Sequence, residues 1–126
     1  MSERKKILLI DDEKGFSVML KLNLESSEQY EVLIENDSRN GLETALNFKP
    51  DLILLDVIMP HLEGPDVARK IEDNPQLHKV PIIFLTAMLT FREMVENNGS
   101  IGGRPFIAKP SDIEIIVNTI EQHLNG

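Results

Sequence analysis

The chain has 126 residues, 41% of them hydrophobic, which is enough to bury a core and fits one domain over residues 1–126. It has no cysteine, which excludes a disulfide framework and a thiolate metal site. Its 21 acidic and 13 basic residues give a net charge of −8, so we expect no direct binding to nucleic acid or to anionic membranes. The first apolar run, residues 7–10, is too short for a signal peptide or a membrane span, and we expect a cytoplasmic protein.

The first half of the chain alternates short apolar runs with helix-like patterns. Residues 7–10 are apolar throughout, which is typical of a strand buried on both faces of a sheet. Residues 14–25 are predicted to form a helix, because apolar side chains recur at helical spacing, at Phe16, Met19, Leu20 and Leu24. A strand at 31–34, a helix at 38–48 that ends before Pro50, and a strand at 52–55 follow.

The second half repeats this alternation and ends in a helix. We expect a helix at 65–73, a strand at 81–85, a weaker helix at 89–97 and a short strand at 106–108. Residues 102–105, Gly-Gly-Arg-Pro, read as a stiff entry to that strand, with Pro105 tolerated at a sheet edge. Ser111 and Glu114 match a capping box with Ser111 at the N-cap, and the final helix then buries Ile113, Ile116, Val117, Ile120 and Leu124.

The order of these elements predicts an α/β protein with a doubly wound (βα)5 fold, a five-stranded parallel sheet and helices on both faces. Polar residues follow four of the strands: Asp11-Asp12, Asp56, Thr86 and Lys109. In such folds ligands bind at the carboxyl ends of the strands, where the strand order reverses. In the flavodoxin-like order 2-1-3-4-5, borrowed here from other doubly wound proteins, the three carboxylates would lie side by side with the hydroxyl and the ammonium group opposite.

Three adjacent carboxylates repel one another, and a hard divalent cation such as Mg²⁺ relieves that repulsion. A carboxylate can also act as a nucleophile and form an acyl phosphate. Phosphoryl transfer requires mainly positioning and charge neutralisation, to which Lys109 and Thr86 could contribute. Taken singly, each residue has a simpler interpretation: Asp11-Asp12 as helix capping, Asp56 and Thr86 as ordinary strand-end residues, and Lys109 as a solvated lysine. Their joint occurrence at successive strand ends favours the chemical interpretation.

These motifs resemble those of the receiver domains of bacterial two-component response regulators. The matching segments are Ile10-Asp11-Asp12-Glu13, Asp56-Val57-Ile58-Met59-Pro60 with Gly64, Thr86-Ala87 and Lys109-Pro110. Their order and spacing match over essentially the whole chain. The resemblance implies a signalling switch that catalyses only its own phosphorylation and dephosphorylation, rather than an enzyme with external substrates.

The resemblance also implies a role for each matching residue. Asp56 would accept the phosphoryl group, and Asp12, Asp56 and the main-chain carbonyl of Ile58 would ligate Mg²⁺, with Asp11 holding the ion through a water. Thr86 and Lys109 would contact the phosphoryl group. Phe106 matches the aromatic switch position, although a plain core phenylalanine would look the same in sequence. Lys109-Pro110 matches a peptide bond that is cis in the family, whereas only about 5% of X-Pro bonds are cis.

Two positions next to the predicted site are apolar. Ile58, two residues after the predicted phosphoacceptor, and Met88, two residues after the threonine, occupy positions that influence hydrolysis of the acyl phosphate in the family. Because neither side chain can orient a water molecule, we expect a comparatively long-lived phosphoryl group.

The resemblance further predicts two kinds of partner. A histidine kinase or histidine phosphotransfer protein would dock near Val18 and Leu22. A downstream effector would bind the face made by the fourth helix, the fifth strand and the fifth helix, which includes Ile115 and Phe91. Scattered exposed apolar residues are also normal on any protein surface. The predicted oligomeric state is a monomer or a phosphorylation-dependent dimer. Only two residues follow Leu124, so we expect no output domain on this chain. The cognate kinase, the output and membership of a longer regulator stay open.

Two other functions compete with this interpretation. A phosphohydrolase of the haloacid-dehalogenase type also uses an aspartyl phosphate, but it needs Asp-x-Asp after its first strand, where this chain has Asp11-Asp12-Glu13. A degenerate receiver would act only as a binding module, although all the chemical positions are filled here. A P-loop nucleotide switch is excluded because no G-x-x-x-x-G-K-[ST] motif occurs.

Overall fold

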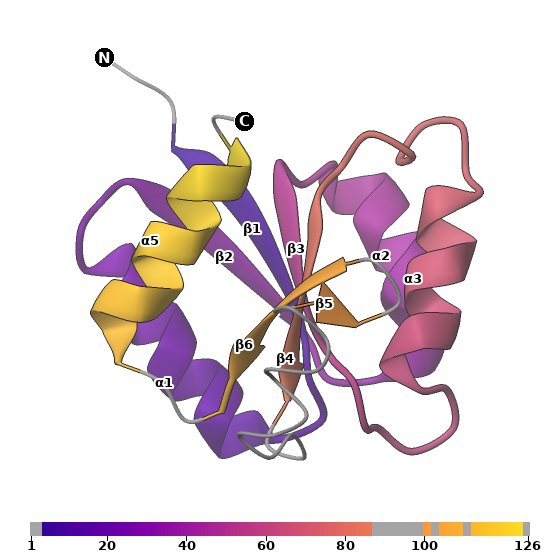
Figure 1. Cartoon of the computed structure of the whole chain (residues 1–126), viewed down its shortest axis with the longest axis horizontal. Helices are drawn as coiled ribbons and strands as arrows, with labels where there is room; N and C mark the ends of the chain where they lie inside the picture. The colour runs from indigo at the N-terminus through magenta and orange to yellow at the C-terminus, as the bar shows by residue number, and fades with distance from the viewer. Residues whose placement is uncertain (1–3, 87–99, 102–103, 110–111, 125–126) are drawn as a thin grey trace.

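A computed structural model of the chain describes residues 4–86, 100–101, 104–109 and 112–124. The helix predicted at 89–97 lies outside these residues. Five parallel strands form the sheet: β1 (Lys5–Ile10), β2 (Tyr30–Glu35), β3 (Leu52–Asp56), β4 (Ile82–Thr86) and β6 (Arg104–Ala108). Their order is β2-β1-β3-β4-β6, which confirms the predicted order 2-1-3-4-5 with β6 as the fifth parallel strand (Figure 1).

A short sixth strand, β5 (Ser100–Ile101), was not predicted. It pairs antiparallel with β6, so that Ser100 faces Pro105 and Ile101 faces Arg104. Pairing of β6 with β4 begins only at Phe106. The expectation that residues 102–105 merely lead into the edge strand is therefore wrong, because β5 extends the sheet beyond β6. The Gly102-Gly103 dipeptide between the two strands is a hairpin signal that the sequence interpretation missed.

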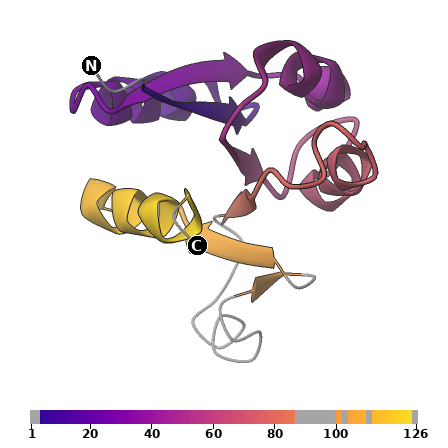
Figure 2. The ribbon, with the colours of Figure 1, turned by 90° about the horizontal axis from the view of Figure 1, so that it is seen from above.

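Helices cover both faces of the sheet, as predicted. One face carries α1 (Lys14–Glu25) and α5 (Ile113–Leu124), and the other carries α2 (Gly41–Phe48) and α3 (Gly64–Glu72); Figure 2 separates the two layers. A 3-10 turn, η1 (Ser38–Asn40), precedes α2. The Ile116 N–H donates to the carbonyl of Asp112, which puts Asp112 at the N-cap of α5 in place of the predicted Ser111. No helix in the described ranges combines the length and apolarity needed to span a bilayer.

The core has two layers because successive strand residues point to opposite faces. Ile7 and Leu9 pack against the buried side chains of α1 and α5, whereas Leu8 and Ile10 pack against those of α2 and α3. Each fully buried side chain of this size contributes about 1.5–3 kcal/mol to folding. The central strand β3 is buried along its whole length, which holds its last residue, Asp56, in a fixed place.

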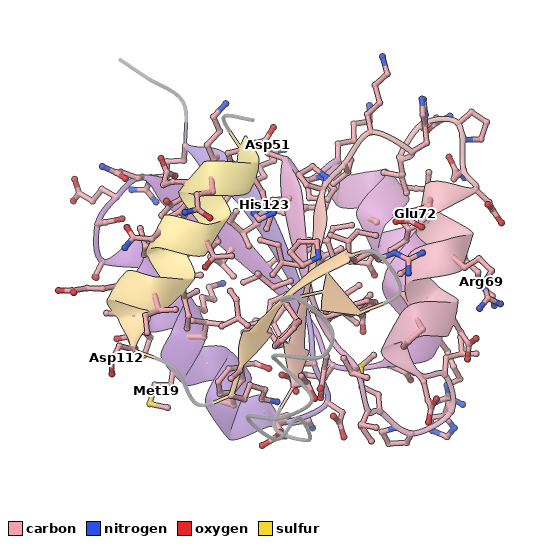
Figure 3. The ribbon with its side chains drawn as sticks, viewed as in Figure 1. Met19, Asp51, Arg69, Glu72, Asp112 and His123 are labelled. Carbon is pink, nitrogen blue, oxygen red and sulfur yellow. The ribbon has the colours of Figure 1, made fainter. Side chains whose placement is uncertain are left out.

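One of the apolar side chains that predicted α1 lies outside the core. Met19 on α1 is 58% exposed, and its side chain points away from the sheet (Figure 3). Ser17 is fully buried in the same helix, because its hydroxyl group donates to the carbonyl of Glu13 over 2.8 Å. The buried stripe of α1 therefore runs through Ser17, Leu20 and Leu24.

Candidate functional site

Three carboxylates meet at the carboxyl ends of β1 and β3. These strands are neighbours with Ile10 opposite Leu55, so the residues that follow them, Asp11 and Asp56, also lie side by side. Asp11 is completely buried and Asp56 is 5% exposed, while Asp12 is partly exposed. Carboxylate oxygens of the three residues lie within 4.8 Å of one another. The structure thus brings together the acidic residues that the sequence singled out.

Lys109 reaches this cluster from the other half of the sheet. Its N–H donates to the carbonyl of Thr86, which joins the ends of β6 and β4. Its ammonium nitrogen lies 2.9 Å from Oδ2 of Asp11 and 3.6 Å from Oδ2 of Asp56. The same nitrogen lies 2.7 Å from Oε1 of Glu13 and 4.4 Å from the centre of the Phe16 ring. Lys109 is therefore a buried counter-charge to the carboxylates and not a solvated lysine.

The electrostatics of the cluster make Asp56 hard to ionise. Burial raises the pKa of Asp56 to about 7, and the neighbouring charges of Asp11 and Asp12 also raise it; Lys109 and a main-chain hydrogen bond from Ile58 act in the opposite direction. Burial lowers the pKa of Lys109, but its hydrogen bonds with Asp11 and Glu13 outweigh burial, and the net pKa lies above the ordinary value. The lysine stays charged, yet it does not fully offset the carboxylates.

The donor set fits a hard divalent cation. The three aspartates supply only oxygen ligands, the type that Mg²⁺ and Ca²⁺ prefer. Two of the aspartates are buried and close enough to share one ion, and the third opens toward solvent. A bound cation would lower the pKa of Asp56 by adding positive charge where Lys109 alone is insufficient.

The loop after β3 is held close to this cluster. The N–H of Gly64 donates to the carbonyl of Val57 over 2.8 Å, which closes the loop of residues 57–63. A Cβ atom at Gly64 would overlap the main-chain carbonyl of Asp56, so this close approach requires glycine. Ile58 lies in the loop with its side chain 50% exposed, next to the cluster.

The remaining predicted residues are placed as follows. Thr86 ends β4 and is 2% exposed. Phe106 lies opposite Phe84 in the sheet and is partly buried against the side chains of the α2–α3 layer. Met88 and Pro110 lie outside the described residues. The influence of Met88 on hydrolysis and the cis bond between Lys109 and Pro110 therefore stay predictions.

A family model described as the response regulator receiver domain matches residues 7–121. The chain belongs to this family. It is 38% identical over 119 residues to the response regulator ArlR of Staphylococcus saprophyticus, an alignment that covers 94% of this chain and 52% of ArlR. It is 35% identical over 107 residues to the response regulator PleD of Caulobacter vibrioides, covering 85% of this chain and 23% of PleD. The receiver thus spans about half of one relative and about a quarter of the other.

Solved structures agree with this assignment. The chemotaxis protein CheY4 of Vibrio cholerae superposes with a TM-score of 0.81 at 26% identity, covering 95% of this receiver and 98% of CheY4. The signal receiver domain of a histidine kinase from Syntrophus aciditrophicus has a TM-score of 0.81 at 28% identity, covering 97% of this chain and 91% of that one. The receiver fold is therefore shared with a chemotaxis protein and with the signal receiver domain of a histidine kinase.

Sequence reasoning missed several side chains around the site of this receiver. Glu13 and Phe16 contact the Lys109 ammonium group, and Asn36 Nδ2 donates to the main-chain carbonyl of Asp11 over 2.7 Å. Ser38 contacts the loop after β3. Polar residues after a strand read as ordinary turn formers, so only the tertiary contacts distinguish them.

Proposed function

We propose that this receiver is the phosphoacceptor switch of a two-component phosphorelay and that it takes a phosphoryl group onto Asp56 in a Mg²⁺-dependent reaction. The observation that carries the proposal is the buried Asp56 carboxylate, which lies within 4.8 Å of the carboxylate oxygens of Asp11 and Asp12 and 3.6 Å from the Lys109 ammonium group. The domain then catalyses its own phosphorylation and dephosphorylation and has no other substrate.

Each residue has a defined task in this proposal. Mg²⁺, when bound, neutralises charge on the carboxylates and on the incoming phosphoryl group. Asp12, Asp56 and the carbonyl of Ile58 would hold the ion directly, and Asp11 would hold it through a water. A carboxylate oxygen of Asp56 attacks phosphorus, the N–P bond of the donor phosphohistidine breaks, and the histidine leaves. Lys109 then pairs with a phosphoryl oxygen.

Thr86 and Phe106 would report the new state. The Thr86 hydroxyl group donates a hydrogen bond to the phosphoryl group, and Phe106 on the adjacent strand turns inward as Thr86 moves. The change is read on the surface of β6 and α5, where Ile115 is 53% exposed. A downstream effector protein or domain is the proposed reader, with a phosphorylation-dependent dimer as the other form of output.

An exposed apolar surface on α1 is the proposed docking site for the phosphodonor. Val18, Met19 and Leu22 are 52%, 58% and 63% exposed, on the helix that begins next to Asp11 and Asp12. A histidine kinase or histidine phosphotransfer protein that covers this surface would bring its phosphohistidine to the site. Leu22→Asp should slow transfer from a histidine phosphodonor but leave phosphorylation by acetyl phosphate unchanged. Equal loss with both donors would contradict docking at α1.

The apolar residues Ile58 and Met88 support a long phosphoryl lifetime, because neither can orient an attacking water molecule. Substitution of both by polar residues should shorten the lifetime, measured as loss of the phosphorylated mass with time. Rapid loss from the native chain, unchanged in the double variant, would contradict this part of the proposal.

The test of the main proposal is the intact mass of the protein after incubation with acetyl phosphate and Mg²⁺. The native chain should gain one phosphoryl mass, and the gain should disappear with EDTA and in Asp56→Asn. Asp51→Asn is the matched control, since Asp51 precedes the same strand at its other end, where its carboxylate accepts from the N–H of Lys6. This control should be phosphorylated like the native chain.

The alternatives predict different results. A receiver that serves only as a binding module would gain no mass from acetyl phosphate or from a cognate kinase. A phosphohydrolase of the haloacid-dehalogenase type would turn over general phosphomonoesters catalytically, whereas the proposed switch would not.

A further inference from the structure

The loop that follows Asp56 contains a strained turn. The N–H of Leu62 donates to the carbonyl of Pro60 over 2.9 Å, which closes a three-residue γ-turn around His61. His61 has a φ angle of 73°, in the left-handed region that non-glycine residues rarely adopt. A γ-turn with positive φ at its centre is rare and strained, so other contacts must hold it in place.

One buried hydroxyl group binds both ends of this turn. Ser38 is 3% exposed, and its hydroxyl group donates to the carbonyl of Pro60 over 2.8 Å. The same oxygen accepts from the N–H of Leu62 over 3.2 Å. The hydroxyl group therefore bridges the two atoms that define the γ-turn, on the loop that begins next to Asp56.

Ser38 is itself fixed by its neighbours. The Asp37 side chain accepts from the N–H of Arg39 over 2.9 Å and pairs with the Arg39 guanidinium group. The N–H of Asp37 donates to the Glu35 carboxylate, which also accepts from the Thr44 hydroxyl group over 2.6 Å. The segment that carries Ser38 is thus held on both sides by hydrogen bonds.

The same segment reaches the other side of the carboxylate cluster. Asn36, two residues before Ser38, donates from Nδ2 to the main-chain carbonyl of Asp11 over 2.7 Å. Residues 36–38 therefore contact the main chain after β1 through Asn36 and the main chain after β3 through Ser38. Residues 36–38 contribute no carboxylate to the cluster, yet they connect the main chain after β1 with the loop after β3.

We propose that Ser38 is a positioning residue of the metal site: its hydroxyl group holds the strained turn at residues 60–62 and thereby positions the loop that carries Ile58, whose main-chain carbonyl is a proposed ligand of the ion. The inference rests on the proposed Mg²⁺-dependent function. A hydroxyl group with a purely packing role would matter equally for any property of the fold, whereas this one acts specifically on the loop of residues 57–63. Loss of such support around metal ligands lowers metal affinity by about 10–100-fold.

The experiment measures Mg²⁺ affinity without phosphorylation, by calorimetric titration and by amide chemical shifts, in five proteins: the native chain, Ser38→Ala, His61→Gly, the double variant and Tyr30→Phe. Ser38→Ala should weaken Mg²⁺ binding by about tenfold relative to the native chain. His61→Gly removes the steric cost of positive φ. In that background, Ser38→Ala should therefore weaken Mg²⁺ binding by less than about threefold relative to His61→Gly alone. Tyr30→Phe is the matched control, because it also removes a hydroxyl group from a buried residue. Tyr30 begins β2, at the end of the strand away from the site, and its hydroxyl group donates to Glu121 of α5. The control should bind Mg²⁺ like the native chain.

The outcomes separate this inference from the proposed function. Native Mg²⁺ affinity in Ser38→Ala would overturn the role of Ser38 while leaving Mg²⁺ binding itself intact. An equal loss in Tyr30→Phe, or an undiminished loss in the His61→Gly background, would show general destabilisation and would also overturn it. A native chain that binds no Mg²⁺ would overturn both the inference and the proposed function. Thermal unfolding of all five proteins accompanies the titrations, so that affinities are compared among folded proteins.

Discussion

The carboxyl edge of the sheet has two halves that solve different problems. The acidic half, at the ends of β1 and β3, holds Asp11, Asp12 and Asp56. Side-chain hydrogen bonds from Asn36 and Ser38 fix the main chain at Asp11 and at Pro60 in the loop after β3. The other half, at the ends of β4 and β6, holds Thr86 and Lys109, joined by one main-chain hydrogen bond. The first half concentrates negative charge, and the second supplies Lys109, a long side chain that reaches across to the carboxylates.

The difference explains why the site calls for a cation. In the described part of the chain, Lys109 is the residue that pairs with Asp11 and Asp56, and Glu13 shares its ammonium group. One lysine against this many carboxylates leaves the acidic half with excess negative charge. Burial of Asp56 first, and this neighbouring charge second, raise its pKa. Folding tolerates this arrangement because apolar side chains packed against both faces of the sheet stabilise the fold.

The largest expected effect comes from removing the lysine. Lys109→Met leaves Asp11 and Asp56 buried without their counter-charge, which should lower the free energy of unfolding of the metal-free protein by about 3 kcal/mol at about pH 8. Urea denaturation measures the change. Addition of Asp56→Asn should recover part of the loss, and an unchanged midpoint in Lys109→Met would contradict the proposed charge balance.

Metal addition should act on the same half with a somewhat smaller effect. Mg²⁺ at a hundred times its dissociation constant should stabilise the native chain by about 2.7 kcal/mol, because it binds only the folded state. Thermal unfolding with and without EDTA measures this shift. Asp12→Asn should lose most of it, and equal stabilisation in that variant would place the ion elsewhere.

The pH dependence of the metal-free protein sharpens the comparison further. The pKa of Asp56 is raised from 3.8 to about 7, so the folded state holds this proton more tightly than the unfolded state. Its contribution to stability is present below the unfolded pKa and is lost as pH rises through about 7. Between about pH 5.5 and pH 8 the native chain should lose about 2 kcal/mol relative to Asp56→Asn. Parallel stability curves for the two proteins would refute the raised pKa.

The smallest effect is expected for an ion pair that lies outside the carboxylate cluster. Arg104 at the start of β6 donates from Nε to the Glu72 carboxylate of α3 over 2.8 Å and makes a second, parallel hydrogen bond from Nη2. Glu72→Gln should cost only about 0.5–1 kcal/mol, since the pair is partly exposed. Mg²⁺ titration should give the native affinity. A lower Mg²⁺ affinity in Glu72→Gln would mean that the acidic half depends on this contact at the start of β6.

The sequence predicted the parts of this protein that depend on local patterns. The apolar run of residues 52–55 had to be buried on both faces, and Ile116 and Ile120 repeat at helical spacing and are buried. Met19 also lies at helical spacing, but it is exposed because Ser17 and not Met19 lies on the face of α1 that packs against the sheet. Spacing identifies a stripe on a helix, and the neighbouring elements decide which stripe is covered.

The sequence by itself determined the alternation of strands and helices and the chemical type of residue at each strand end, because periodicity and strand termination are local properties. It also carried the motifs of the receiver family, and these supplied the strand order. Two features depend on packing between distant elements: Glu13 shares the ammonium group of Lys109, and Asn36 and Ser38 contact the main chain after β1 and the loop after β3. These contacts join residues far apart in the chain, and their geometry depends on how whole elements pack, which no local pattern encodes.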